Sequence, residues 1–329
     1  AELNIPDYEN LDDINFNFEA QNKLTEIFNL NFNFQNLNFS SKNLEIKEEK
    51  SGEYNIKGNI ENSKALINPI LISKLINIKQ DYLSNKDIII KSKNSFSFKF
   101  TKKKKIKNIK IDSEVSFNEI YFNEKYKSII FLKEGTINSK LENEQFTANL
   151  QSNFAFYDDL KLNNDFKNNN LKLFLKSENS KKIKINGSIN NGKILIEPKI
   201  FFSLLNLDSQ LLSKKKVNVV TDNKFKFEVN NGKIENYLIA SNINFDKLEF
   251  NKEVQDIVYL KNLKTKLSIE DDLLNIDLKS NYSFFDKNLN NDSDKNIFNF
   301  KYNKSKTKIS DLEIFIKTDN NKINTKEIQ

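Results

Sequence analysis

The sequence predicts a mainly β protein: a long antiparallel meander curled into an open, taco-like groove, with about one amphipathic helix per repeat of about 130 residues. Two observations support this fold class. Apolar and polar residues alternate with a period of two along most of the chain, as in Phe96, Phe98 and Phe100, which is typical of half-buried antiparallel strands. The chain also repeats itself, and an internal repeat has to be recognised before a fold is assigned.

The repeat is fixed in register by rare residues. The stretch IKGNIENSKALINPILISKLINI at 56–78 returns without a gap as INGSINNGKILIEPKIFFSLLNL at 185–207. Gly187 lies 129 positions after Gly58, and Pro198 lies 129 after Pro69, so two of the three prolines coincide. A shift of one residue extends the match from NLQSNFAFYD at 149–158 to DLKSNYSFFD at 277–286. We therefore predict a duplicated unit.

The repeat divides the chain into four parts. Residues 1–52 are interpreted as the end of a preceding repeat, 53–181 as repeat unit A, 182–310 as repeat unit B, and 311–329 as the start of a following repeat. The last part is placed by the resemblance of LEIFIKTDNN at 312–321 to LKLFLKSENS at 171–180. Both ends fall inside repeats and the chain contains no methionine, so we expect an internal fragment of a longer protein.

Each unit is expected to hold about eight strands and one helix. Turns between strands are predicted at Glu134-Gly135 and at the Asn-Asn-Gly clusters 190–192 and 230–232, and Asn-Gly steps in particular favour tight hairpins. One helix is predicted to begin at Pro69 and to continue through Tyr82, and its copy to begin at Pro198 and continue through Leu212. Both are apolar round more than half of their circumference, so each needs cover on two sides or an apolar partner that is not protein.

Composition excludes several function classes. The 28 Phe and 10 Tyr indicate a chain that buries a core, although its mean hydropathy is only −0.62. The net charge is +7, yet every cation is a lysine, whereas bases and single phosphates are usually recognised by the guanidinium fork of arginine. Nucleic acid is therefore not expected as a partner.

Catalytic and metal chemistry finds little support. The absence of Cys removes disulfides and thiolates, and the absence of His removes the commonest general base and transition-metal ligand. The remaining acidic candidates are Asp158 with Asp159 and Asp271 with Asp272, and adjacent Asp residues are more often turn formers than catalysts. We expect no enzyme activity, no cofactor and no metal site.

The strands carry more apolar surface than one helix per unit can cover, so the sheet must either fold onto itself or enclose apolar cargo. The Phe-rich meander, the recurring phrase VSFNEIYF at 115–122 and the leucine-rich segment FFSLLNL at 201–207 resemble the AsmA-like superfamily, in particular its large YhdP and TamB type members. The resemblance extends from about residue 11 to residue 318.

This resemblance implies a repeating β-groove with an apolar inside and a polar outside. It implies the periplasmic part of an inner-membrane-anchored protein of a Gram-negative envelope, bridging inner and outer membranes through parts outside this segment. Its partners would be phospholipid acyl chains, which the groove carries or shields, and its role would be outer-membrane biogenesis. The apolar surplus agrees with this reading, because each buried methylene contributes about 0.8 kcal/mol.

The candidate lipid-groove residues are the apolar positions expected to face inward. They are Phe96, Phe98, Phe117, Phe154, Phe156, Phe225, Phe227, Ile243, Phe245, Tyr282 and Phe284.

Two alternatives stay open. The lysine runs at 102–105 and 214–216 either face anionic headgroups or are solvated turns that protect a sheet edge. The main rival function is a structural or adhesive β-repeat protein whose sheet closes over a dry side-chain core.

Overall fold

The computed structural model describes residues 11–34, 37–69, 83–103, 105–122, 130–156, 168–179, 182–197, 215–231, 233–249, 258–271, 273–284, 296–305 and 311–317. Strands make up 87% of these residues, so the prediction of a mainly β protein is confirmed. The helices predicted at 69–82 and 198–212 lie, apart from Pro69, outside the described residues. Within the described part, no helix is long and apolar enough to cross a membrane.

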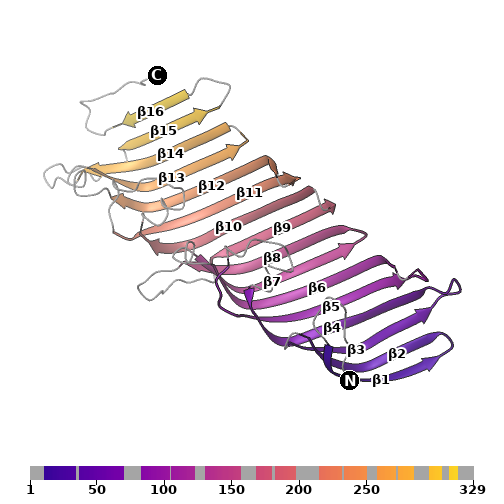
Figure 1. The fold of residues 1–329 in the computed structure, drawn as a ribbon. Coiled ribbons are helices and arrows are strands. Elements are labelled where there is room, and N and C mark those ends of the chain that lie inside the picture. Colours follow the sequence, from indigo (N-terminus) through magenta and orange to yellow (C-terminus); the bar gives the residue numbers. More distant parts are fainter. Residues whose placement is uncertain are drawn as a thin grey trace. The chain divides into compact units, whose positions relative to one another are not determined.

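The sheet is antiparallel and open, and its strands follow one another in chain order from β1 to β16 (Figure 1). The strands are β1 (Leu11–Gln21), β2 (Leu24–Phe34), β3 (Leu37–Glu48), β4 (Tyr54–Ile67), β5 (Ile88–Phe100), β6 (Ile106–Tyr121), β7 (Ile130–Glu142), β8 (Gln145–Phe156), β9 (Asn170–Asn179), β10 (Lys182–Ile196), β11 (Val217–Asn230), β12 (Lys233–Glu249), β13 (Val258–Glu270), β14 (Leu273–Phe284), β15 (Ile297–Lys304) and β16 (Asp311–Lys317). The chain divides into two compact units, 1–160 with 172–185 and 161–171 with 186–329, and each is described by itself.

The described residues of 53–181 form six strands, β4 to β9, and those of 182–310 form another six, β10 to β15. The described residues thus hold fewer strands per unit than the expected number of about eight. The strands are long: β6 has 16 residues and β12 has 17.

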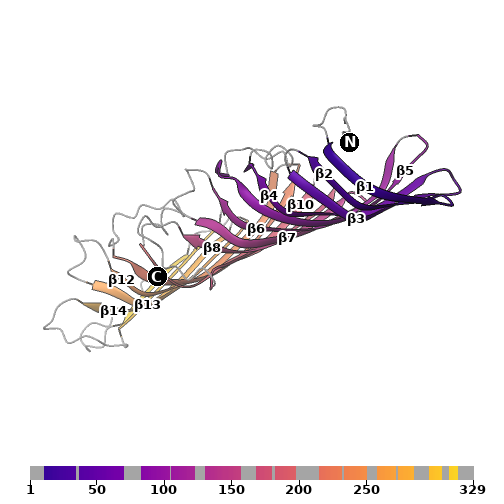
Figure 2. The same ribbon diagram turned by 90° about the horizontal axis from the view of Figure 1, so that it is seen from below.

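Among the described residues, a bulge followed by a tight hairpin is found in β1, β7 and β13. A bulge residue with positive φ lies in β1 (Asp13, 52°), in β7 (Glu134, 51°) and in β13 (Asn262, 51°). Each of these strands then enters a two-residue turn whose first residue also has positive φ, at Asn22, Asn143 and Asp271. Such turns match the right-handed twist of the strands that they join. Bulges also bend strands, and in Figure 2 the strands of the first unit bow along their length.

One of the three predicted turns is confirmed and two are wrong. Asn230 is the last residue of β11 and lies opposite Lys233, the first residue of β12, so the chain turns between them. Glu134 and Gly135 instead lie inside β7, and 190–192 lie inside β10. Glu134 is a bulge residue, Gly135 faces the Phe117 ring, and Asn191 belongs to a buried polar cluster, and none of these roles is visible in local turn chemistry.

In each unit the buried apolar side chains lie toward one end of the strands. From β3 onward, the connections at one end of the strands have two residues (143–144) to six (305–310). The connections at the other end have eight (122–129) to twenty (68–87). The core side chains lie next to the long connections. In the first unit they include Ala65, Ile88, Phe117, Leu132 and Phe154, and in the second Ile194, Val217, Val219, Phe245 and Tyr282.

Candidate functional site

An apolar row crosses the first unit with one residue from each of eight strands. Directly paired positions share a face, and the pairing links β1 through β8 without interruption. The row is Phe18, Ile27, Leu44, Gly58, Phe96, Ile111, Leu141 and Phe146. Phe18 is 65% exposed, Gly58 has no side chain, and the others are half-buried. This row is called the cross-strand row below.

The second unit carries the same row at the repeat offset. Phe225 of β11 pairs with Ile239, which pairs with Ile269, which pairs with Leu274. These four correspond to Phe96, Ile111, Leu141 and Phe146, and all four are half-buried. The row is therefore a property of the repeat.

The predicted groove residues separate into two groups. Phe96 and Phe98 of β5 are half-buried neighbours with ring centroids 6.0 Å apart, and Phe225 and Phe227 of β11 are their counterparts at 5.7 Å. Five others are buried in the protein, namely Phe117, Phe154, Ile243, Phe245 and Tyr282. Phe156 and Phe284 are the last residues of β8 and β14.

The opposite face is polar, and the hollows lined by described residues lie on it. In the first unit Glu61, Lys93 and Glu114 oppose one another in adjacent strands and line a hollow of about 430 Å³. In the second unit Lys266 opposes Asp277 beside a hollow of about 300 Å³. These hollows are charged, so the case for apolar cargo rests on the cross-strand row and not on a cavity.

A polar cluster interrupts the apolar face at the same place in both units. In the second unit, Asn191 donates to the Val219 carbonyl at 3.0 Å, and the Thr221 hydroxyl donates to Asn191. Asn223 donates to Thr221 Oγ1 and to the Ile189 carbonyl, each at 2.8 Å. In the first unit, buried Asn62 and Ser92 take the places of Asn191 and Thr221.

This cluster fixes the register of β10 on β11. Asn191 and Thr221 are both buried, and buried polar groups are costly unless hydrogen-bonded. A slip of one residue would separate these partners and reverse every side chain on the face.

Packing of one aromatic ring explains Gly135. Phe117 pairs with Gly135 across β6 and β7, and a Cβ at residue 135 would lie 1.9 Å from Phe117 Cζ. The Phe117 ring is 4% exposed and therefore has little room to move away. Glycine is required here by the ring and not by the backbone angles.

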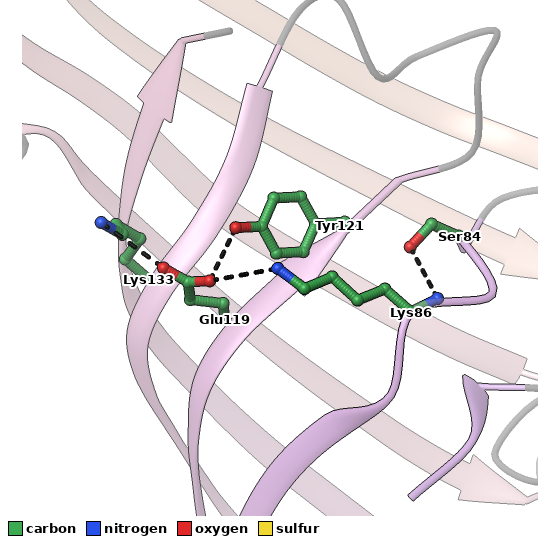
Figure 3. A network of polar contacts seen from close by, with 5 residues as sticks. All are labelled: Ser84, Lys86, Glu119, Tyr121 and Lys133. Carbon is green, nitrogen blue, oxygen red and sulfur yellow. Dashed lines mark hydrogen bonds and ion pairs between the residues drawn. The ribbon is translucent and has the colours of Figure 1, made fainter. Parts of the chain in front are cut away.

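A charged cluster lies at the strand ends near the long connections (Figure 3). Tyr121 donates a 2.6 Å hydrogen bond to Glu119, and Lys86 and Lys133 lie 3.6 and 3.5 Å from the same carboxylate. The ammonium of Lys86 also sits 3.8 Å above the Tyr121 ring. The hydrogen bond from Tyr121 lowers the pKa of Glu119, and the two lysines act in the same direction. The cluster ties the residues before β5 to β6 and β7, helped by the Ser84 amide, which donates to the Tyr121 carbonyl.

The second unit contains the same cluster with its carboxylate moved by two residues. Lys247 and Glu249 occupy the positions of Glu119 and Tyr121. Glu249 contacts both Lys215 and Lys247 at 2.6 Å, and Lys247 lies 4.2 Å from the centre of the Tyr259 ring. Burial raises the pKa of Glu249, but the two lysines outweigh it, and the net shift is downward. A displacement of two residues keeps the acid on the same face of the strand, so the pairing persists although the residue types changed.

The acidic candidates give no catalytic arrangement among the described residues. Asp271 forms the β13–β14 turn, and its carboxylate accepts a 3.1 Å hydrogen bond from the Tyr237 amide. Asp158, Asp159 and Asp272 lie outside the described residues. In the described part of the chain no group of acidic side chains is arranged to hold a metal ion.

Comparison with protein-family models, with curated proteins and with solved structures gives no match for this chain. The resemblance to the AsmA-like superfamily therefore stays a prediction.

Sequence reasoning missed the polar and charged clusters. The repeat alignment carried a usable signal for the first: Asn62 and Asn191 align, as do Asn94 and Asn223. The charged cluster left no such signal, because its acid stands at different positions in the two copies.

Proposed function

We propose that this chain carries or shields phospholipid acyl chains along the apolar face of its sheet. The observation that supports this is the half-buried cross-strand row, which recurs in both units on an open sheet whose other face is charged. Eight strands spaced about 4.8 Å apart extend the row over about 34 Å, comparable to the roughly 30 Å hydrocarbon thickness of a bilayer. An acyl chain lying across the strands would contact one apolar side chain from each strand except β4, where Gly58 has no side chain.

The remaining parts of this proposal come from the resemblance to the AsmA-like superfamily. The sheet curls into a groove, and an amphipathic helix in each repeat borders it. The chain is the periplasmic part of an inner-membrane-anchored bridge that supports outer-membrane biogenesis. More repeats lengthen the same apolar path toward the second membrane.

The rival function, a structural or adhesive repeat with a dry core, is favoured by a different observation. Phe154 is 1% exposed and Phe117 4% exposed, so the strand ends near the long connections are already filled with protein. Under this alternative the sheet would close so that protein side chains instead of lipid cover the half-buried row.

The experiment compares neighbours on opposite faces of β5. A photo-crosslinking amino acid placed at Phe96 is expected to capture phospholipid in envelope-expressed protein, whereas the same group at Ser97 is not. Phe96→Asp should release co-purifying lipid, and Ser97→Asp should retain it. Equal crosslinking at both positions, or none at Phe96, would overturn the proposal. Crosslinks from Phe96 to protein alone would support the dry-core alternative.

A further inference from the structure

The β5–β6 hairpin concentrates positive charge that the fold does not neutralise. Residues 99–110 contain seven lysines and no acidic residue. Lys99 is paired with Glu49 at 2.7 Å and Lys110 with Glu142 at 2.6 Å. The lysines between them that the structure describes are Lys102, Lys103, Lys105 and Lys107, and all are exposed and form no ion pair with any described residue.

Exposed apolar side chains lie beside these lysines. Tyr54 pairs with Phe100, and Phe100 pairs with Ile106, so one apolar residue from each of β4, β5 and β6 shares a face at the tip. Tyr54 is 43% exposed and Ile106 is 54% exposed. A bulge at Asn108, with φ of 52°, places Ile106 on the face of Ile111 although the two positions differ by an odd number, five.

The turn that presents these groups is ordered by its own hydrogen bonds. The Thr101 amide donates to the Lys105 carbonyl at 2.9 Å, and the Lys105 amide donates to Thr101 Oγ1 at 3.1 Å. Thr101 is buried, so the lysines project from a defined hairpin.

We propose that this hairpin tip docks on an anionic phospholipid bilayer. Lysines attract the negative surface, and an exposed tyrosine and isoleucine suit the boundary between headgroups and acyl chains. A nucleic acid would use the charge but not the apolar pair, and an all-lysine patch lacks the forked donors that favour phosphate recognition. The other lysine run differs, because Lys215 is held by Glu249.

Binding to vesicles tests the charge. Wild-type protein is expected to sediment with vesicles of equal parts phosphatidylcholine and phosphatidylglycerol, but not with phosphatidylcholine alone, and to be released by salt. Each lysine should contribute about fivefold in partitioning. Replacing Lys102, Lys103, Lys105 and Lys107 with Gln should therefore reduce binding by about several hundredfold. The control quadruple, with Gln at four exposed lysines of equal total charge (Lys224, Lys233, Lys264 and Lys266), should bind like wild type.

Equal loss in both quadruple variants would overturn the proposal, because net charge and not the tip would then control binding. Absence of wild-type binding to the anionic vesicles, or tighter binding to a DNA duplex than to them, would also overturn it.

Labelling tests the geometry independently of those variants. The chain has no cysteine, so Ile106→Cys and Ile234→Cys each give a single labelling site. Ile234 is a matched control because it is 61% exposed and also lies just after a tight hairpin turn. An environment-sensitive dye at 106 should shift to the blue on anionic vesicles, while the dye at 234 should not.

The same response at both sites, or none at 106, would overturn tip docking. This proposal stands without the acyl-chain proposal: crosslinking at Phe96 tests the row, and vesicle docking tests the hairpin.

Discussion

Gly135→Ala should destabilise the first unit through Phe117 alone. The new Cβ would lie 1.9 Å from Phe117 Cζ, whereas ordinary contacts are 3.4–4 Å, so the ring would have to retreat by about 1.5 Å. Overpacking of this kind costs about 1–3 kcal/mol, and the reduced freedom of the unfolded chain returns about 0.4–1 kcal/mol. We expect a net loss of about 1–2 kcal/mol in the free energy of unfolding.

The measurement is urea unfolding followed by circular dichroism, with hydrogen exchange of β6 and β7 amides to locate the effect. Phe117→Ala on its own should cost about 3–5 kcal/mol. In that background Gly135→Ala should become neutral or stabilising by up to about 1 kcal/mol, because the ring is gone. The second unit shows the alternative solution, since Leu263 pairs with Phe245 at the equivalent site and both are buried.

This reasoning would be refuted if the stability changes of Gly135→Ala and Phe117→Ala were additive. If Gly135→Ala changes stability equally with and without the Phe117 ring, the steric account is wrong.

Three further predictions concern the polar and charged clusters. Asn191→Leu should cost about 1–3 kcal/mol in urea unfolding because Thr221 loses its acceptor, and adding Thr221→Val should recover part of that loss; no recovery would contradict the cluster's role. The pKa of Glu249 is lowered in the folded state, so this carboxylate stabilises the fold above its unfolded pKa near 4.5, and that stabilisation is lost as pH falls through the folded pKa. In thermal unfolding measured from about pH 7 to about pH 3, Glu249→Gln should therefore reduce the loss of stability at low pH. The same loss in the variant as in wild type would contradict this prediction. Glu119→Lys should lower the stability of the first unit to urea. Adding Tyr121→Glu, which recreates the arrangement of Lys247 and Glu249 in the second unit, should restore that stability. A double variant no more stable than the single variant would show that the two clusters are not equivalent.

Much of the architecture could be predicted from the sequence, because alternation and repetition can both be read directly from the order of residues. Period-two alternation predicted antiparallel strands. Residues that are equivalent by the offset between the two copies also make the same hydrogen bonds in the structure. Ser152 donates to the carbonyls of Lys133 and Asn153 at 3.0 and 2.7 Å, and Ser280 makes the same two bonds in the second unit.

The turn predictions that failed depended on Gly and Asn, residue types that occur both in turns and at special positions inside strands. Gly in a strand marks either a turn or a close approach, and only the position of the Phe117 ring shows that Gly135 is the second kind. Asn191 likewise favours turns in isolation, but its side chain is satisfied across strands by Val219 and Thr221. A bulge also lets one strand continue where alternation breaks, as at Asn108 in β6.

The sequence by itself determined the mainly β class, the repeat and the face on which apolar residues gather, because these depend on the spacing of residues along the chain. Only the tertiary structure decided which of those apolar residues are buried. Phe96 and Phe117 lie on one face, yet Phe117 is packed beside the long connections while Phe96 stays half-buried. Burial depends on neighbours from other strands, and the alternation along one strand does not show which neighbours those are.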